Sequence, residues 1–125
     1  MQTLHMKPWK DERGTSAVEF AIVGPVFLLL VVGFLYLCLS LFLVGSLHFA
    51  VEEGARCASV RTTVCSDNAT TVAYAQSRYF GPSSPTFTYQ AAAACGKSVS
   101  GSVSYVVELV IRRITVPVTA TACYP

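Results

Sequence analysis

The feature that most constrains this chain is a long apolar run near its start. From Phe20 to Leu47 the sequence holds 28 consecutive residues without a charged side chain or a histidine. A helix crosses the ~30 Å hydrocarbon core of a membrane with about 20 apolar residues. The apolar part of a cleaved secretory signal is shorter, about 7–15 residues, and ends in a small-residue cleavage site that is missing here. The run therefore predicts one transmembrane helix.

The run is longer than a membrane requires. If His48 is neutral, the apolar stretch reaches from Phe20 to Val51, and its 32 residues would measure roughly 48 Å as one helix at about 1.5 Å per residue. We therefore expect the helix to tilt or to leave the bilayer as a stalk. Toward its end, small residues recur at every fourth position: Ser46, Ala50, Gly54 and Ala58. Such a stripe suits either the close approach of another helix or packing against the protein's own sheet.

Composition and charge argue against several classes of protein. Charged residues make up 13% of the chain, about half of the ~25% that soluble domains carry, and the mean hydropathy is +0.52. These values argue against a free cytosolic protein and against a disordered one. The net charge of +2 is too small for the clustered basic face of a nucleic-acid-binding protein. We therefore expect no nucleic-acid partner.

Charges that flank the run predict its orientation. Lys7, Lys10 and Arg13 precede it, whereas two glutamates follow it before any basic residue occurs. Segments rich in Lys and Arg stay in the cytoplasm. We therefore expect the N-terminus inside and residues 52–125 outside the membrane.

Of the five cysteines, Cys38 lies within the run and four lie beyond it: Cys57, Cys65, Cys95 and Cys123. An even number of cysteines in a small extracytoplasmic domain predicts two disulfides, with three possible connectivities. If residues 57–65 were one helix, the Cα atoms of Cys57 and Cys65 would stand ~12 Å apart, beyond the reach of a disulfide. Both would then pair with Cys95 and Cys123. A break near residues 62–63 would remove this objection.

The residues beyond the membrane predict mixed structure. Helical spacing continues from Val51 to Arg61, and residues 66–68 offer N-terminal caps for a second helix that ends at Gly81-Pro82. Segments rich in Val, Thr, Ile and Tyr then predict three or four antiparallel strands, at 86–90, 98–111 and 114–124. Pro117 favours an edge position for the last strand. The expected fold class is α+β: a long N-terminal transmembrane helix extends into a small outer domain with a second short helix and a three- to four-stranded antiparallel sheet.

Catalytic machinery is not visible in the sequence. The two histidines are His5, before the run, and His48, at its far end, so an outer catalytic triad would lack an imidazole unless His48 supplied it. Phosphate-binding glycine loops and the cysteine spacings of zinc sites are missing too. We therefore expect no enzyme, no catalytic, cofactor-binding or metal-binding residues, and no cofactor.

One charge, Glu19, stands at the start of the apolar run. It either lies at headgroup level and caps the first helical turn, where negative charge is favoured, or it has a functional partner. Its surroundings favour the second interpretation, because Arg13-Gly14-Thr15-Ser16-Ala17-Val18-Glu19-Phe20 resembles the processing site of type IV prepilins. The closest resemblance is to the TadE-like pseudopilins of tight-adherence (Tad) pili. Pro25 and the Gly54-Ala55-Arg56 stretch are also typical of that family.

The resemblance implies processing followed by assembly. A prepilin peptidase would cut between Gly14 and Thr15, which makes Glu19 the fifth residue of the mature protein and Phe20 the aromatic residue after it. Glu19 and Phe20 would then set the register in which subunits assemble. The implied division is a cytoplasmic leader peptide (1–14), a transmembrane and assembly helix (15–51) and an extracytoplasmic pilin-like domain (52–125).

The resemblance also implies a function and a location. The protein would be a minor pilin or pseudopilin that takes part in the assembly of a Tad-type adhesion or secretion pilus. Its partners would be the membrane, the prepilin peptidase, other pilins and the assembly platform of the bacterial inner membrane. It would cross that membrane once and enter the extracellular pilus in some of its copies. The alternative is a permanently anchored single-span envelope protein whose outer domain binds a partner or ligand.

Overall fold

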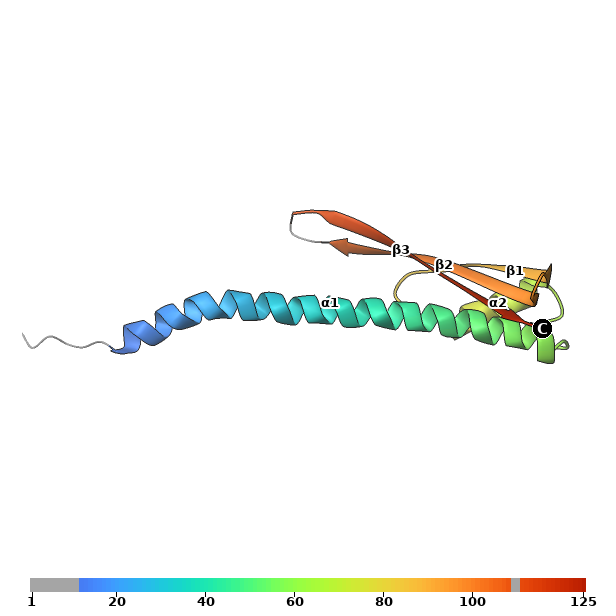
Figure 1. Ribbon diagram of the computed structural model, residues 1–125, viewed down its shortest axis with the longest axis horizontal. Coiled ribbons are helices and arrows are strands. Elements are labelled where there is room, and N and C mark those ends of the chain that lie inside the picture. The colour runs from blue at the N-terminus through green and yellow to red at the C-terminus, as the bar shows by residue number, and fades with distance from the viewer. Residues whose placement is uncertain (1–11, 109–110) are drawn as a thin grey trace, which may run out of the picture. The chain divides into compact units, whose positions relative to one another are not determined.

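One helix accounts for most of the first half of the chain. The computed structural model describes residues 12–108 and 111–125, and Figure 1 shows their helices and strands. Helix α1 spans Glu12–Val60, 49 residues that include Pro25. Its Leu, Val, Phe and Ala residues suit a helix, which satisfies the backbone hydrogen bonds of an apolar segment internally. The chain divides into two compact units, one ending at Leu37 and the other covering Cys38–Pro125, and α1 contributes to both.

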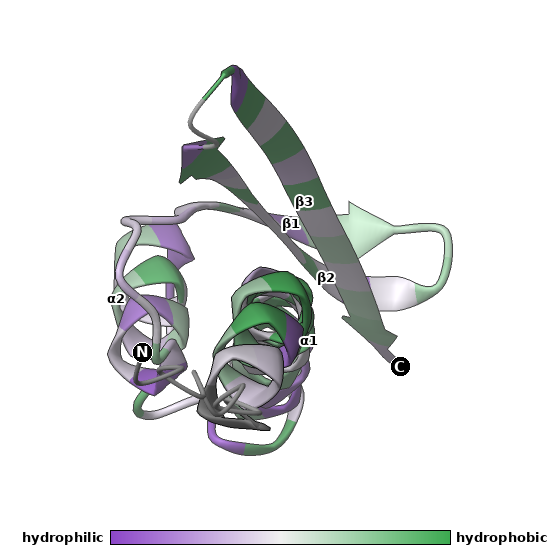
Figure 2. Ribbon diagram, turned by 90° about the vertical axis from the view of Figure 1, so that its left-hand side faces the viewer, coloured by the Kyte–Doolittle hydropathy of each residue, from purple (hydrophilic) through white to green (hydrophobic). Residues whose placement is uncertain are grey.

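The unit from Cys38 onward is a small α+β domain, as the sequence predicts. After α1 come helix α2 (Asn68–Arg78) and the strands β1 (Thr86–Ala93), β2 (Gly96–Glu108) and β3 (Arg113–Tyr124). The three strands form one antiparallel sheet in the order β1-β2-β3. Viewed from the end of the molecule, the sheet lies over α1 and α2, which are next to each other (Figure 2). Strand β3 is at an edge, as Pro117 predicts.

The core of this unit is built from small and medium apolar side chains. Its members are Leu47, Ala50, Val51 and Ala55 of α1, Ala75 of α2, and Phe87, Val99, Val103 and Ala120 of the sheet. The stripe of small residues on α1 faces this core. A Cβ added at Gly54 would lie only 3.1 Å from the Cβ of Ala75, and Ala58 is fully buried. The stripe therefore packs against the protein's own second helix and sheet.

The two faces of the sheet differ in chemistry. On the face toward α1, Val99, Gly101 and Val103 of β2 stand opposite Ala122, Ala120 and Val118 of β3. On the opposite face, Ser98, Ser100 and Ser102 stand opposite Cys123, Thr121 and Thr119. The banding of the strands in Figure 2 follows this alternation, which is the period-2 pattern of a sheet that is buried on one side. One face therefore makes the core, and the other presents hydroxyl groups.

Both expected disulfides are present in the folded unit. Cys57 pairs with Cys65 across a Cα–Cα distance of 5.8 Å, and Cys95 pairs with Cys123 across 6.1 Å. The argument against the first pair assumed an unbroken helix, and that assumption is wrong, because α1 ends at Val60 and the chain turns at residues 62–65. This end of the helix agrees with the break near residues 62–63 that the sequence left open. Cys38 is the free cysteine of the described residues.

Helix α2 begins with a capping box. The backbone N–H of Thr70 donates to Asp67 Oδ1 at 2.8 Å, and the backbone N–H of Asp67 donates to Thr70 Oγ1 at 3.1 Å. The hydrogen bond from the Thr70 backbone N–H has the largest effect on the Asp67 carboxylate, and the bond from the Thr70 hydroxyl has the next largest. Both stabilise the carboxylate and so lower the pKa of Asp67. At the other end of α2, the Phe80 N–H donates to Ser46 Oγ at 2.7 Å. This bond ties the exit of α2 to α1.

Candidate assembly site

The described part of the first unit is a helix that is apolar on every face. Its large hydrophobic side chains from Val18 to Leu35 are all exposed within the unit, and Phe20 and Leu29 expose 78% and 73% of their surface. A helix that is hydrophobic all round is stable when lipid or other protein surrounds it. Among the described residues, one helix is long and apolar enough to span a membrane, Gly14–Val60. The part of this helix in the first unit therefore requires lipid or other protein around its apolar side chains.

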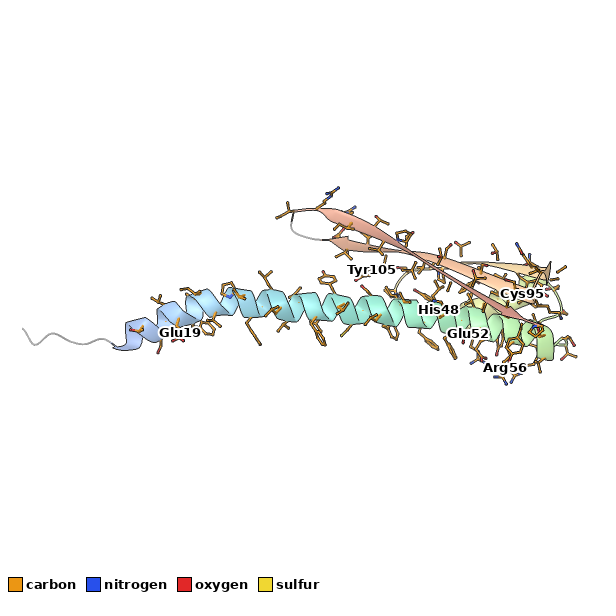
Figure 3. The ribbon with its side chains drawn as sticks, viewed as in Figure 1. Glu19, His48, Glu52, Arg56, Cys95 and Tyr105 are labelled. Atoms are coloured by element: carbon orange, nitrogen blue, oxygen red, sulfur yellow. A yellow bond between two sulfur atoms is a disulfide. The ribbon has the colours of Figure 1, made fainter. Side chains whose placement is uncertain are left out.

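Glu19 is the single acidic residue between Gly14 and Val51. It lies on α1 between two exposed apolar residues, Val18 and Phe20, near the beginning of the helix (Figure 3). A carboxylate in apolar surroundings is costly unless an opposite charge or a hydrogen-bond donor accompanies it. Thr15 precedes Glu19 by four residues, about 6 Å along the helix axis and on the same face. A positive charge at Thr15 would thus lie on the same side of the helix as the carboxylate.

The predicted cleavage point lies at the beginning of the same helix. Gly14 and Thr15 are helical and exposed, and nothing lies within 4 Å of the position that a Gly14 Cβ would take. Because α1 begins at Glu12, the Gly14–Thr15 bond falls in its first turn. Backbone N–H groups of a first turn have no helical partners, so this turn opens at little cost. The predicted cleavage point is therefore exposed, in a turn that can open locally.

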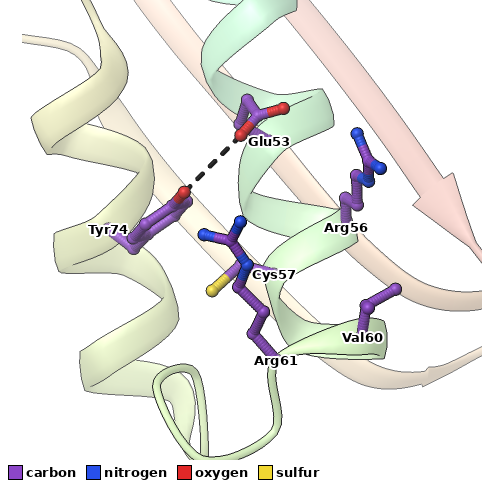
Figure 4. A pocket seen from close by; sticks show the side chains of 6 residues that line it. All are labelled: Glu53, Arg56, Cys57, Val60, Arg61 and Tyr74. Atoms are coloured by element: carbon purple, nitrogen blue, oxygen red, sulfur yellow. Dashed lines mark hydrogen bonds between the residues drawn. The ribbon is translucent and has the colours of Figure 1, made fainter.

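The folded unit offers a small polar cavity of about 150 Å³ rather than a catalytic centre. Glu53, Arg56, Cys57, Val60, Arg61 and Tyr74 line it, as Figure 4 shows. The Tyr74 hydroxyl donates a long hydrogen bond of 3.5 Å to Glu53 Oε2 and accepts one of 3.1 Å from Arg78 Nη2. The Arg78 guanidinium also lies over the Tyr74 ring, 5.0 Å from its centroid. The bond from Tyr74 to Glu53 links α2 to α1, whereas the contacts between Arg78 and Tyr74 lie within α2.

A metal site is not evident in the part of the chain that the structure describes. These residues contain no group of three or more His, Cys, Asp or Glu side chains placed to hold a metal ion. Four of the cysteines are used in disulfides.

The segment that carries these features also matches a known family. Residues 14–56 match the family model described as TadE-like protein. Over this segment, about a third of its length, the chain is similar to TadE-like proteins. The match begins at Gly14 and contains Glu19, Phe20 and the Gly54-Ala55-Arg56 stretch, which are the residues behind the sequence resemblance. No curated protein and no solved structure matches the chain.

The similarity to TadE-like proteins indicates a coarse function. The family is one of minor pilins associated with the Tad pilus, and its members are structural rather than enzymatic proteins. It implies association with a membrane and with other pilus components. The one apolar helix of the described residues fits a single-pass membrane pilin.

Sequence reasoning located the residues of the first unit but not those that shape the second. Gly14, Thr15, Glu19 and Phe20 all lie within two turns of α1. The contacts of Glu53, Tyr74 and Arg78 were missed, because no local pattern links residues 21 positions apart. The use of α1 by the folded unit was one of the two interpretations of the small-residue stripe. The membrane boundary at residue 51 was placed by hydropathy and charge, although the core of the folded unit already includes Leu47 and Ala50.

Proposed function

We propose that this TadE-like protein is a minor pilin, or pseudopilin, that joins Tad pilus assembly after a prepilin peptidase removes residues 1–14. One observation carries the proposal: between Gly14 and Val51, an exposed apolar stretch of helix bears a single carboxylate, Glu19, five residues after Gly14 and inside the TadE-like match. The apolar helix must be surrounded by lipid or protein, and the carboxylate must have a group that stabilises its charge. In this proposal the membrane provides both before assembly, and neighbouring pilin helices provide both after it.

The folded unit limits how much of α1 is left for the membrane. Leu43 and Leu47 expose 1% and 0% of their surface, so the helix is already in the domain core by that point. The stretch that remains between Phe20 and Phe42 has 23 residues, about 34 Å at ~1.5 Å per residue. That length fits a hydrocarbon core of ~30 Å with modest tilt. In this proposal the outer domain therefore begins before residue 52, the boundary that charge alone suggests.

Cleavage creates a positive charge that can pair with Glu19. Removal of residues 1–14 leaves Thr15 with an α-ammonium group, and the helix then carries one positive and one negative group in an apolar surface. When subunits pack side by side, the Thr15 ammonium of one pairs with Glu19 of its neighbour. A register that leaves either charge unpaired is disfavoured because an uncompensated charge in an apolar groove is costly. Phe20, 78% exposed, adds a large apolar contact beside the pair.

The proposal places the protein in the bacterial inner membrane. Lys7, Lys10 and Arg13 keep the N-terminus in the cytoplasm, and the two disulfides suit an oxidising outer compartment. Its partners are the membrane, the prepilin peptidase, other pilins and the inner-membrane assembly platform. Copies that leave the membrane with the filament reach the extracellular pilus.

N-terminal sequencing and intact mass of membrane-extracted protein test the proposal. In cells that carry the peptidase, the wild-type protein should begin at Thr15. A Gly14→Leu variant should keep residues 1–14, whereas the matched Gly33→Leu variant should be cut normally. Both glycines have open space where a side chain would go, so neither substitution disturbs packing. A wild-type protein that retains residues 1–14 would support a permanently anchored envelope protein instead.

A further inference from the structure

The hairpin formed by β2 and β3 continues past the core of its unit. Its pairing is regular to the last described pair, so the alternation of the two faces continues as well. We call the last five pairs, Ser104–Glu108 with Arg113–Pro117, the distal hairpin. Val103, just before it, is 4% exposed, whereas Val116 and Ile114 of the distal hairpin expose 43% and 42% of their surface. The core therefore ends where the distal hairpin begins.

The two faces of the distal hairpin differ in chemistry. The inner face continues the one that makes the core, and its side chains are uncharged and apolar or aromatic: Tyr105, Val107, Ile114 and Val116. The outer face carries an exposed ion pair between Arg113 and Glu108, with a distance of 2.7 Å from Nη2 to Oε1. The outer face is therefore suited to water, whereas the contiguous exposed apolar side chains of the inner face mark a surface that binds a partner.

The buried half of the inner face already packs on a helix. There, Val99 lies against Gly54 of α1, and Gly101 lies against Leu47. Because strands twist, a sheet face turns along its length, and a straight helix under one half does not follow it into the other. Val116 and Ile114 stay exposed. The distal half of the face is therefore a helix-packing surface that the described part of its own unit leaves open.

The first-unit part of α1 is a helix that needs such a surface. From Phe20 to Leu35 it has no charged residue, and its large hydrophobic side chains are exposed. Each strand of the distal hairpin extends about 16 Å at ~3.3 Å per residue, which is roughly three helical turns. Two strands about 4.8 Å apart make a ribbon roughly as wide as the ~10 Å of one helix. The inner face therefore fits one apolar helix.

We propose that the inner face of the distal hairpin binds the first-unit part of α1 from a second copy of this chain. Every copy carries both surfaces, and because the two differ, the contact can repeat from one copy to the next along a filament. It is looser than the contact inside the unit, since Phe20–Leu35 lacks the small-residue stripe that lets α1 lie close to its own sheet. The inference rests on the proposed function, because this helix becomes free of lipid only in a filament. It predicts that copies of this protein are neighbours in the pilus.

Photo-cross-linking in assembled pili tests this inference. One full-length form of the protein has p-benzoylphenylalanine in place of Ile114 and carries one C-terminal tag. A second form, of unchanged sequence, carries a different tag and is made in the same cells. Sheared pili are irradiated, and products that carry both tags are digested with trypsin and sequenced by mass spectrometry. Trypsin does not cut between Arg13 and Arg56, so the helix is recovered as one peptide.

The matched control has the same photoprobe at Thr115, the exposed neighbour of Ile114 on the outer face. The Ile114 probe should link to residues 20–35 of the differently tagged copy, and the Thr115 probe should not. A link from Ile114 to lipid, to its own chain, to the hairpin of the second copy or to another pilin would overturn the inference. Absence of the protein from pili altogether would refute the proposed function, and the inference with it.

A charged substitution gives a second readout. Val116→Asp places a carboxylate in the proposed apolar contact, where an unpaired charge is costly, so the amount of protein in pili should fall by more than about tenfold. The unfolding midpoint of the domain should stay at the wild-type value, because Val116 lies outside the core. Thr115→Asp, on the outer face, should change neither quantity. Normal incorporation of Val116→Asp into pili would contradict the proposed contact.

Discussion

The two units use the same helix and similar residues for opposite purposes. In the first unit, Phe20 and Leu29 keep most of their surface exposed, whereas in the second unit Leu43 and Leu47 are almost fully buried. Hydropathy does not separate these stretches, because both are strongly apolar. The spacing of small residues does: Ser46, Ala50, Gly54 and Ala58 recur at every fourth position in the second unit, whereas Val26–Val44 contains only Gly33 and Ser40 as Gly, Ala or Ser residues. A helix needs a small-residue stripe where a sheet must approach it, and none where lipid is its neighbour.

If the first unit is an assembly surface, removing the one charge of its apolar stretch, Glu19, should affect filaments and leave the domain intact. Removing one member of a buried ion pair costs roughly 3–5 kcal/mol, so Glu19→Gln should strongly deplete the protein from pili. Insertion and cleavage after Gly14 should continue, because neither uses the carboxylate in this proposal. The measurement compares cleavage, membrane abundance and surface pili in one strain.

Glu52→Gln is the matched control, since Glu52 is exposed on the second-unit part of α1. It should leave all three readouts unchanged. If Glu19→Gln supports normal piliation, Glu19 only caps the helix, an effect of a few tenths to about one kcal/mol. That outcome would remove the main support for the pseudopilin proposal.

The disulfides should matter only for the second unit, and unequally. Chain-entropy arguments give about 2.5 kcal/mol for the separation of 8 residues between Cys57 and Cys65, and about 3.6 kcal/mol for the 28 between Cys95 and Cys123. Replacing Cys95 and Cys123 by Ala should therefore lower the unfolding midpoint of the outer domain more than replacing Cys57 and Cys65. Urea unfolding in detergent, followed by circular dichroism, measures both.

Cys38→Ala is the control for the disulfide variants, because this free cysteine lies on α1 and bridges nothing. Its midpoint should equal that of the wild type. Equal losses for the two disulfide pairs would show that the unfolded state, or strain in the folded one, dominates over loop length.

Much of this fold was predictable because its signals are local. The apolar run, the cap at Asp67 and the strand composition predicted the helices and the sheet, and Pro117 predicted the edge strand. Disulfide pairing was not predictable, since it depended on whether α1 ended before Cys65. Close to the end of the helix at Val60, Lys97 donates a hydrogen bond to the carbonyl oxygen of Ala58, 39 residues away, a contact that no local pattern predicts. For the candidate site, Glu19 was singled out from its neighbours in sequence, whereas the partner proposed for it belongs to another subunit and leaves no pattern in this chain.

A bulky residue in the stripe tests whether the part of α1 that faces the sheet differs from the part proposed to face lipid. Gly54→Val places its side chain against Ala75, whose Cβ is 3.1 Å from the position of the new Cβ. Overpacking of this kind typically costs 1–3 kcal/mol. Gly33→Val, on the open first-unit part of the same helix, should leave the unfolding midpoint of the domain unchanged. Equal stability of the two variants would show that the contact between α1 and α2 rearranges at little cost to accommodate the larger side chain.

The smallest effect is expected from the charge on the cap of α2, which belongs wholly to the second unit. The hydrogen bonds from Thr70 hold the pKa of Asp67 in the folded state below its ordinary value of 3.8. The carboxylate therefore contributes stability that is complete above that value and is lost as the pH falls toward the lower, folded pKa. Asp67→Asn keeps a capping side chain but cannot ionise. The difference between the urea midpoints of the two proteins should be constant from pH 7 to about 5 and shrink below pH 4. A difference that stays constant down to pH 3 would assign the stabilisation to the geometry of the cap, with no contribution from its charge.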